Sequence, residues 1–131
     1  MKKEENLEYC AFCDDFMKNK ERLFENELAV AFFDGFPVSK GHVLIITKRH
    51  TKTFFDTTKA EQDAMFELLR KAKDYIDKEY HPTGYNIGFN CGEDAGQSVM
   101  HVHLHLIPRY YGDVENPRGG IRGVIPTKKD Y

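Results

Sequence analysis

The chain lacks long apolar segments, and this absence sets a first limit on its function. Its 131 residues contain no apolar run of about 18 residues, so we expect no membrane-spanning helix. The charged N-terminal residues 1–10 are followed by no apolar stretch, and we therefore expect no secretory signal. Internal repeats, low-complexity tracts and a linker between two compositional halves are also missing. The length and this uniformity indicate one domain.

An excess of charge of one sign is missing as well. The chain has 19 Lys and Arg against 21 Asp and Glu, which gives a formal net charge of −2. Nucleic-acid-binding domains usually carry a basic face, so this balance argues against a general nucleic-acid binder. A nucleotide held by a few local groups remains compatible with it.

Cysteine is scarce, with Cys10, Cys13 and Cys91 as the three examples. An odd number of cysteines without a secretory signal indicates a reducing compartment, and free thiols or a metal site rather than disulfides. We therefore expect a cytoplasmic protein. Cys10 and Cys13 form a Cys-x-x-Cys pair, which is half of a zinc site. We interpret Cys91 as an ordinary buried or loop thiol.

Hydrophobic periodicity predicts an α+β fold. The clearest helix spans about residues 58–80, because apolar residues recur there at helical spacing after a capping-box pattern at Thr58 and Glu61. Apolar and β-branched runs predict five strands, at residues 22–24, 28–34, 42–47, 85–90 and 99–107. We also expect a short helical turn within residues 9–17. Residues 111–131 are predicted to form an extended tail that packs on the domain or on a partner.

Three histidines alternate with apolar residues in the last predicted strand. On a strand, His101, His103 and His105 would point the same way, each about 6–7 Å from the next. Two chemistries suit such a row: ligands of a catalytic metal, or a nucleophile tuned by its neighbours. An imidazole is largely neutral at cellular pH, so it can attack phosphorus without first losing a proton to a strong base.

The loop before this strand favours the nucleophile over the metal. Gly96 permits close backbone approach, Gln97 offers an amide and Ser98 a hydroxyl, and all three suit phosphate oxygens. A metal site alone gives no reason for these groups. A simple polar turn between two strands is the alternative interpretation of the loop.

The segment 101–107, HVHLHLI, resembles the motif His-φ-His-φ-His-φ-φ of the histidine triad superfamily, in which φ is apolar. Residues 95–99 and 32–50 also resemble family segments, and the similarity covers about residues 9–110. The resemblance implies a mostly antiparallel five-stranded sheet with one long helix. It implies a domain over 9–110 with an N-terminal zinc knuckle, and a homodimer in which the helix and a sheet edge meet.

The resemblance also implies roles for single residues. His103 would form a covalent nucleotidyl-imidazole with the α-phosphate, and His105 would hydrogen-bond near the phosphate or the leaving group. The other implied nucleotide contacts are Asn90, Gln97 and Ser98 at the phosphate, Asp34 at the ribose hydroxyls, and Phe12 and Phe32 at the base. His42 would either orient the triad or be a core histidine.

The branch of the superfamily that has this cysteine pair binds a structural zinc ion. The resemblance implies that its ligands here are Cys10, Cys13, His50 and His101. Such a closed Cys₂His₂ set leaves no position for substrate, and it would hold the first triad histidine beside His103. Free thiols are the alternative.

The function that the resemblance implies is that of a nucleotide hydrolase or transferase, most directly on diadenosine polyphosphates. Three alternatives stay open: a purine nucleoside phosphoramidase, a hydrolase whose catalytic metal is bound by all three triad histidines, and a nucleotide-binding protein with little turnover. Arg109 and Arg118 either reach the distal phosphates of a long substrate or make surface contacts.

Overall fold

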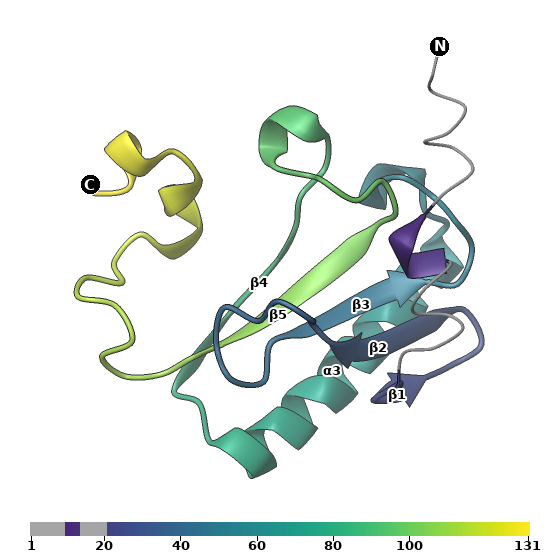
Figure 1. The fold of residues 1–131 in the computed structure, drawn as a ribbon, viewed down its shortest axis with the longest axis horizontal. Coiled ribbons are helices and arrows are strands. Elements are labelled where there is room, and N and C mark those ends of the chain that lie inside the picture. The colour runs from purple at the N-terminus through teal and green to yellow at the C-terminus, as the bar shows by residue number, and fades with distance from the viewer. Residues whose placement is uncertain (1–9, 14–20) are drawn as a thin grey trace.

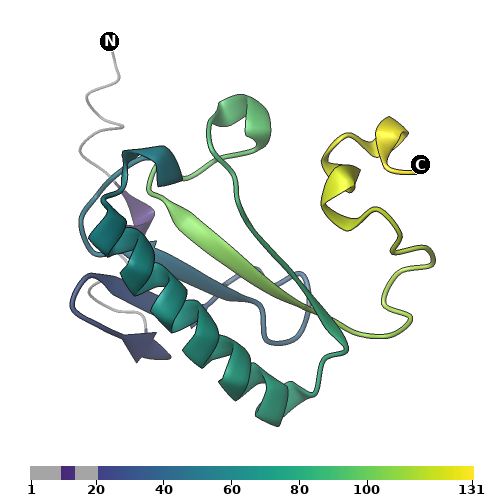
Figure 2. The same ribbon diagram turned by 180° about the vertical axis from the view of Figure 1, so that it is seen from behind.

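The computed structural model describes residues 10–13 and 21–131. Its centre is a five-stranded antiparallel sheet with the strand order β1-β2-β3-β5-β4 (Figure 1). The strands are β1 Phe24–Glu25, β2 Ala29–Phe33, β3 Val43–Thr47, β4 Gly84–Phe89 and β5 His103–Arg109. One long helix, α3 (Lys59–Tyr80), covers a single face of this sheet (Figure 2). The predicted α+β architecture, with its antiparallel sheet and one long helix, is confirmed.

Local chemistry explains where α3 begins and ends. The Thr58 hydroxyl accepts from the backbone N–H of Glu61, and the Glu61 carboxylate accepts from the backbone N–H of Thr58, which is the reciprocal cap predicted from the sequence. The helix ends at His81, which has a left-handed φ of 54° and precedes Pro82. The fully buried apolar side chains of α3 are Met65, Leu68, Ala72 and Ile76.

The sheet has two apolar faces with different neighbours. One face packs on α3, and its buried members are Ala29, Ala31, Val43, Ile45, Leu104 and Leu106. The other face lies under Cys10 and Phe12, and its buried members are Val30, Phe32, Leu44 and Ile46. Residues opposite one another in an antiparallel pair share a face. His103 lies opposite Ile46 and His105 opposite Leu44, so both histidines are on the face away from α3.

The last strand begins later than the sequence predicts. Alternation predicted a strand over 99–107, whereas β5 spans His103–Arg109. The backbone N–H of Val102 donates to the carbonyl of Thr51 at 2.8 Å, so the chain before β5 is bound to a loop instead of a strand. The prediction that all three histidines share one strand is therefore wrong, because His101 lies outside the pairing.

The two ends of the chain compare differently with the sequence prediction. Of the helical turn predicted within residues 9–17 the structure describes 10–13, and residues 11–13 are helical. The tail is not extended: it contains the short 3₁₀ helices η4 (Gly120–Val124) and η5 (Pro126–Lys128) and stands beside the sheet (Figure 1). Within the described part of the chain, no helix combines the length and apolarity needed to cross a membrane.

Candidate active site and metal centre

His103 stands at the start of β5, on the face away from α3. Its Nδ1 lies 2.8 Å from the carbonyl oxygen of His101. A carbonyl only accepts, so the proton is on Nδ1 and the lone pair is on Nε2. The residue is 9% exposed, and the Phe12 ring packs edge-on against it with 5.0 Å between centroids. Burial lowers the pKa of His103, so the ring is a neutral imidazole with one free nitrogen.

A second chain of hydrogen bonds sets the proton of His105. The backbone N–H of Val38 donates to His42 Nδ1 at 3.2 Å, so His42 carries its proton on Nε2. That nitrogen lies 3.0 Å from His105 Nδ1 and 3.4 Å from Asp34 Oδ2. Donation from His42 leaves the His105 proton on Nε2. Burial, with the neighbouring His103 and His42, lowers the pKa of His105 to about 4, so this ring is also neutral at neutral pH.

The two cysteines of the N-terminal pair meet His50 and His101. His101 Nδ1 lies 3.3 Å from Cys10 Sγ and 3.4 Å from Cys13 Sγ. His50 Nδ1 lies 3.3 Å from His101 Nδ1 and 3.6 Å from Cys13 Sγ. A tetrahedral zinc ion with ordinary bond lengths places two nitrogen ligands about 3.3 Å apart, and a nitrogen and a sulfur about 3.6 Å apart. These four separations are therefore close to those of a closed zinc tetrahedron, and all four donor atoms lie within 4.8 Å of one another.

His101 links this cluster to His103. It is fully buried, and its Nε2 lies 2.8 Å from the carbonyl oxygen of Thr47, which puts the ring proton on Nε2 and leaves Nδ1 for a metal. Metal-binding histidines are commonly oriented by such a hydrogen bond. The ring of His101 thus faces the cysteines while its carbonyl holds His103.

The three triad histidines do not converge on one metal position. Among the described residues, His101 belongs to the cluster with the two cysteines, His105 belongs to a group with Asp34 and His42, and His103 belongs to neither. In that second group His42 uses Nε2 as a donor, and its Nδ1 is already bound by a backbone N–H. The geometry does not support a catalytic metal held by all three histidines.

Gln97 is buried in the loop before the triad, and its side chain is occupied by the protein itself. Its oxygen accepts from the N–H of Gly92 at 2.8 Å. Its amide donates to the carbonyls of Lys52 at 2.7 Å and Val99 at 3.1 Å. The residue is 2% exposed, whereas the neighbouring Ser98 is exposed. In this structure Gln97 positions the loop, and Ser98 lies on the surface of the loop.

Asn90 follows β4 and lies close to His103. The β4–β5 pairing ends at Phe89 and Leu104, and Asn90 and His103 are the next residues beyond this pair, on the face of Gly88 and His105. Gly96 has a φ of 99°, and a Cβ on it would lie 3.8 Å from Asn90 Nδ2. The amide of Asn90 and the backbone of the Gly96 turn therefore gather beside His103.

The residues expected around the base and ribose lie on the β2 side of the site. Phe12 and Phe32 are both buried, with ring centroids 5.9 Å apart. Asp34 follows β2; its Oδ1 accepts from the N–H of Phe36 at 2.9 Å, while its Oδ2 faces His42. Asp34 therefore forms a turn and also lies beside the histidines, which combines the two interpretations of this residue.

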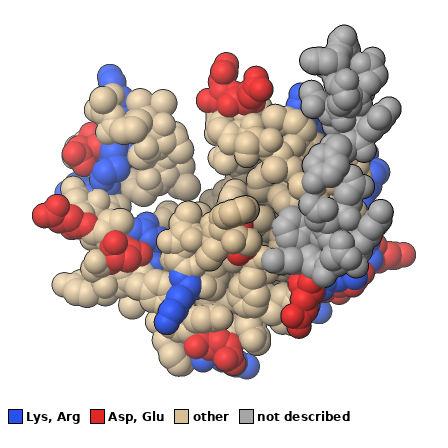
Figure 3. All heavy atoms as spheres, in the orientation of Figure 1, with Lys and Arg blue, Asp and Glu red and all other residues tan. Residues whose placement is uncertain are grey.

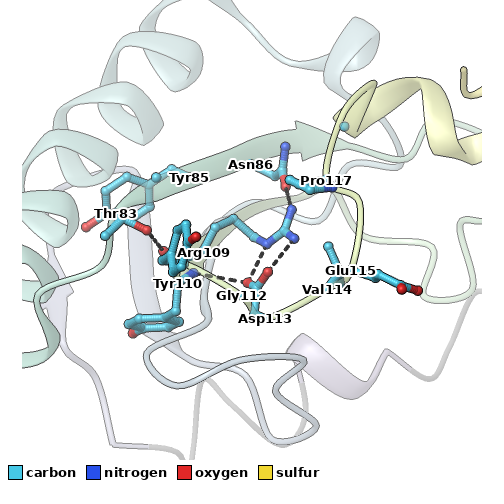
Figure 4. Close-up of a pocket in the computed structure, with 13 residues that line it drawn as sticks. Thr83, Tyr85, Asn86, Arg109, Tyr110, Gly112, Asp113, Val114, Glu115 and Pro117 are labelled. Carbon is cyan, nitrogen blue, oxygen red and sulfur yellow. Dashed lines mark hydrogen bonds and ion pairs between the residues drawn. The ribbon is translucent and has the colours of Figure 1, made fainter. Parts of the chain in front are cut away.

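Arg109 and Arg118 make contacts within the chain. The Arg109 guanidinium donates twice to Asp113, both at 2.8 Å, and once to Asn86 at 2.7 Å (Figure 4). Arg118 lies over the ring of Tyr131, 5.2 Å from its centroid. These contacts favour the structural interpretation of both cations over a role at distal phosphates.

An ion pair beside the Cys/His cluster was missed by sequence analysis. The guanidinium of Arg49, the residue before His50, donates to both oxygens of Glu61 at 2.8 Å. Glu61 is 4% exposed, and Arg49 lowers the pKa of its carboxyl to about 2. The capping box had indicated only the local role of Glu61. The contacts from Thr47 and Val38 were missed too, because they use backbone groups that every such residue possesses.

Comparison with known proteins agrees with this geometry. A profile of the HIT domain matches residues 16–112. Protein hit of Bacillus subtilis is 38% identical over 105 residues, which are 79% of this chain and 72% of that protein. The asymmetrical bis(5'-nucleosyl)-tetraphosphatase of Schizosaccharomyces pombe is 37% identical over 98 residues, 75% of this chain and 54% of the yeast protein. The bis(5'-adenosyl)-triphosphatase of Dictyostelium discoideum is 33% identical over 100 residues, 76% of this chain and 67% of that protein.

Solved structures are similar over most of the chain. A HIT family member from Bacillus subtilis superposes with a TM-score of 0.72 at 38% identity, covering 79% of this chain and 74% of that one. A zinc-bound histidine triad family protein from Mycobacterium smegmatis has a TM-score of 0.73 at 31% identity, covering 83% and 81%. Sequence motif, fold and profile lead to the same conclusion, and this chain belongs to the histidine triad (HIT) family.

Proposed function

We propose that this protein hydrolyses, or transfers, the nucleotidyl group of diadenosine polyphosphates by attack of His103 on the α-phosphorus. The observation that carries the proposal is the 2.8 Å hydrogen bond from His103 Nδ1 to the His101 carbonyl, because it leaves the lone pair of Nε2 free. Two relatives named for the hydrolysis of nucleosyl tetraphosphates and adenosyl triphosphates support the substrate class.

In the first step, His103 Nε2 forms a bond to the α-phosphorus as the bond to the bridging oxygen breaks. The electron pair of that bond leaves with the nucleoside polyphosphate. The nucleotidyl-imidazole is then protonated at Nδ1 and bonded to phosphorus at Nε2, and the His101 carbonyl stabilises its positive charge. In the second step water attacks phosphorus, the phosphorus–nitrogen bond breaks, and its electron pair returns to Nε2. The products are a nucleoside monophosphate and one proton from the water.

The surrounding residues bind the phosphate and the nucleoside in this proposal. His105 donates its Nε2–H to a phosphate oxygen as a neutral ring, and His42 positions it through Nδ1. The other phosphate donors are Asn90 and Ser98, with Gln97 holding their loop. Asp34 accepts from the ribose hydroxyls, and Phe12, supported by Phe32, borders the base.

We also propose a structural zinc ion bound by Cys10, Cys13, His50 and His101. A zinc ion with four protein ligands supplies a cross-link and offers no open position. The donor spacing described above and a zinc-bound relative support this assignment. His101 would then be held from two sides, by the metal and by Thr47, which fixes the carbonyl that orients His103.

A homodimer through β4 and the start of α3 is the quaternary structure we propose. β4 lies at the sheet edge. Beside it the Phe54 and Phe89 rings are 4.8 Å apart, and Phe55, Phe66 and Ile87 are 80%, 38% and 45% exposed. An open edge next to large apolar side chains is a surface that a second copy would cover. Light scattering should give a dimer that Phe66→Glu dissociates; a monomeric wild type would contradict the proposal.

Rapid-quench measurement with α-phosphate-labelled diadenosine tetraphosphate tests the mechanism. We expect acid-labile label on the wild-type protein, and no label on His103→Asn, with kcat lower by about 10⁴-fold. His81→Asn is the matched control, because His81 is exposed and lies outside the site. Turnover without label would exclude the covalent step. Tight binding without turnover would favour the nucleotide-binding alternative.

A further inference from the structure

We propose that the leaving half of the substrate lies over β4, on a strip of the sheet that Gly88 leaves bare beside His105. In this view Gly88 determines which leaving groups the site accepts. The inference rests on the proposed reaction at His103. It adds to that reaction a leaving-group subsite and a residue that controls its width.

Gly88 faces the catalytic side of the sheet. It lies directly opposite His105 in the β4–β5 register, and residues opposite one another share a face. A Cβ at position 88 would meet no atom of the described residues within 4 Å. The space above Gly88 is therefore open, next to the ring that donates to the phosphate.

Neither backbone conformation nor packing requires glycine at this position. Gly88 is not among the residues with positive φ, so its backbone is one that any residue adopts. Position 84, on the same face of β4, is also glycine. Glycine weakens a strand interior, where a β-branched residue would be more favourable. An open surface for a ligand explains why position 88 is glycine, although glycine lowers the stability of the strand.

Along the sheet, the open surface above Gly88 is followed by a hollow. On β5 the next residue after His105 on this face is Ile107, about 6–7 Å further along. Ile107 lines a hollow of about 350 Å³ together with Val38, Asn86 and Val114. The face opposite α3 is indented between the tail and the centre of the molecule (Figure 3).

The nucleoside that is transferred has its place at the opposite end of the same row. Across the sheet the row consists of Phe32, Leu44, His105 and Gly88. Asp34 and Phe32 lie at the β2 end, where the ribose and base are proposed to bind. The β4 end is left for the leaving group, and His105 stands between the two halves.

The hollow fits an uncharged organic body better than a bare polyphosphate. Ile107, Val38 and Val114 are apolar, and Asn86 offers an amide. Arg109 is the one cation among the lining residues of this hollow, and it donates to both carboxylate oxygens of Asp113, which also lines the hollow. The chemistry therefore points to the distal nucleoside of a dinucleoside polyphosphate, with the phosphate chain crossing Gly88.

The test is Gly88→Val, measured with two substrates. Valine suits a strand, and its Cβ would meet no described atom within 4 Å. With diadenosine tetraphosphate the leaving group is a nucleoside triphosphate; with adenosine 5'-phosphoramidate it is ammonia. We expect kcat/KM to fall by about tenfold or more for the dinucleotide and by less than about twofold for the phosphoramidate.

Gly84→Val is the matched control, because it makes the same change on the same face of β4, about 13 Å from position 88. We expect it to alter the ratio of the two kcat/KM values less than Gly88→Val does. An unchanged ratio in Gly88→Val, or an equal change in Gly84→Val, would overturn the inference.

Failure of the proposed function gives a different result, namely a wild-type protein that turns over neither substrate. Calorimetry with a non-hydrolysable dinucleotide and with AMP then tests the strip directly. Gly88→Val should weaken binding of the dinucleotide alone. Equal affinities of both proteins for the dinucleotide would overturn the subsite.

Discussion

The two ends of the histidine row are held by different partners. His101 is fully buried and its ring faces two thiols and a second imidazole, whereas His105 faces His42 and an open surface. Their protons are set differently as well: a carbonyl accepts from His101, and an imidazole donates to His105. The same residue type, four positions apart, therefore has the surroundings of the proposed zinc site at one end and of the proposed phosphate site at the other. The partner of the ring determines its chemistry, and its place in the motif does not.

Removing a ligand of the proposed zinc site should have the largest effect on the protein. Cys13→Ser deletes one of the four proposed zinc ligands, so we expect loss of bound zinc and a decrease in the free energy of unfolding on the order of 4–5 kcal/mol. Metal analysis and denaturant unfolding, with and without a chelator, measure both. Cys91→Ser is the matched control, because this thiol lies outside the cluster. Equal zinc content and equal free energies of unfolding in wild type, Cys13→Ser and Cys91→Ser would contradict a metal-binding role for the cluster around His101.

Removing the hydrogen bond from His42 to His105 should reduce turnover and leave the proposed zinc site unchanged. His42→Leu removes the donor to His105, so we expect kcat to fall by about tenfold to a hundredfold, with unchanged zinc content. His42→Gln retains an N–H donor and should recover part of this loss. Loss of zinc in His42→Leu would mean that the proposed zinc site depends on the His42–His105 pair. An unchanged kcat would remove His42 from the positioning of His105.

We expect the smallest effect from the ion pair between Glu61 and Arg49, the residue before the proposed zinc ligand His50. The pKa of Glu61 is about 2 in the folded protein and ordinarily 4.5. Its contribution to stability is therefore complete above pH 4.5 and is lost as the pH falls toward 2. Since the Arg49 side chain is half exposed, we expect this contribution to be about 2 kcal/mol after screening.

Unfolding measured across this pH range tests the pair. Glu61→Gln should lose the acid-dependent part of the stability curve, whereas Asp63→Asn, an exposed carboxylate on the same helix, should change little. Parallel curves for wild type and Glu61→Gln would show that the Arg49 pair contributes nothing measurable.

The long helix could be predicted closely because its information is local. The cap at Thr58 and Glu61 and the stop at His81 lie within the helix or next to it, and predicted residues 58–80 compare with Lys59–Tyr80 observed. The last strand was predicted less well. Its alternating pattern continues before residue 103, but the pairing does not, because Val102 bonds to the loop at Thr51. Pairing depends on a distant partner, which periodicity does not contain.

By itself the sequence determined the chemical groups of the site and their family: three alternating imidazoles, a thiol pair, and a glycine-bearing loop before the triad. Only the tertiary structure decided which nitrogen of each ring carries the proton, since the deciding groups are at Thr47, His101 and Val38. It also decided which space stays open, above Gly88. Backbone donors, backbone acceptors and empty volume are brought to the site from separate segments, and residue identity does not encode them.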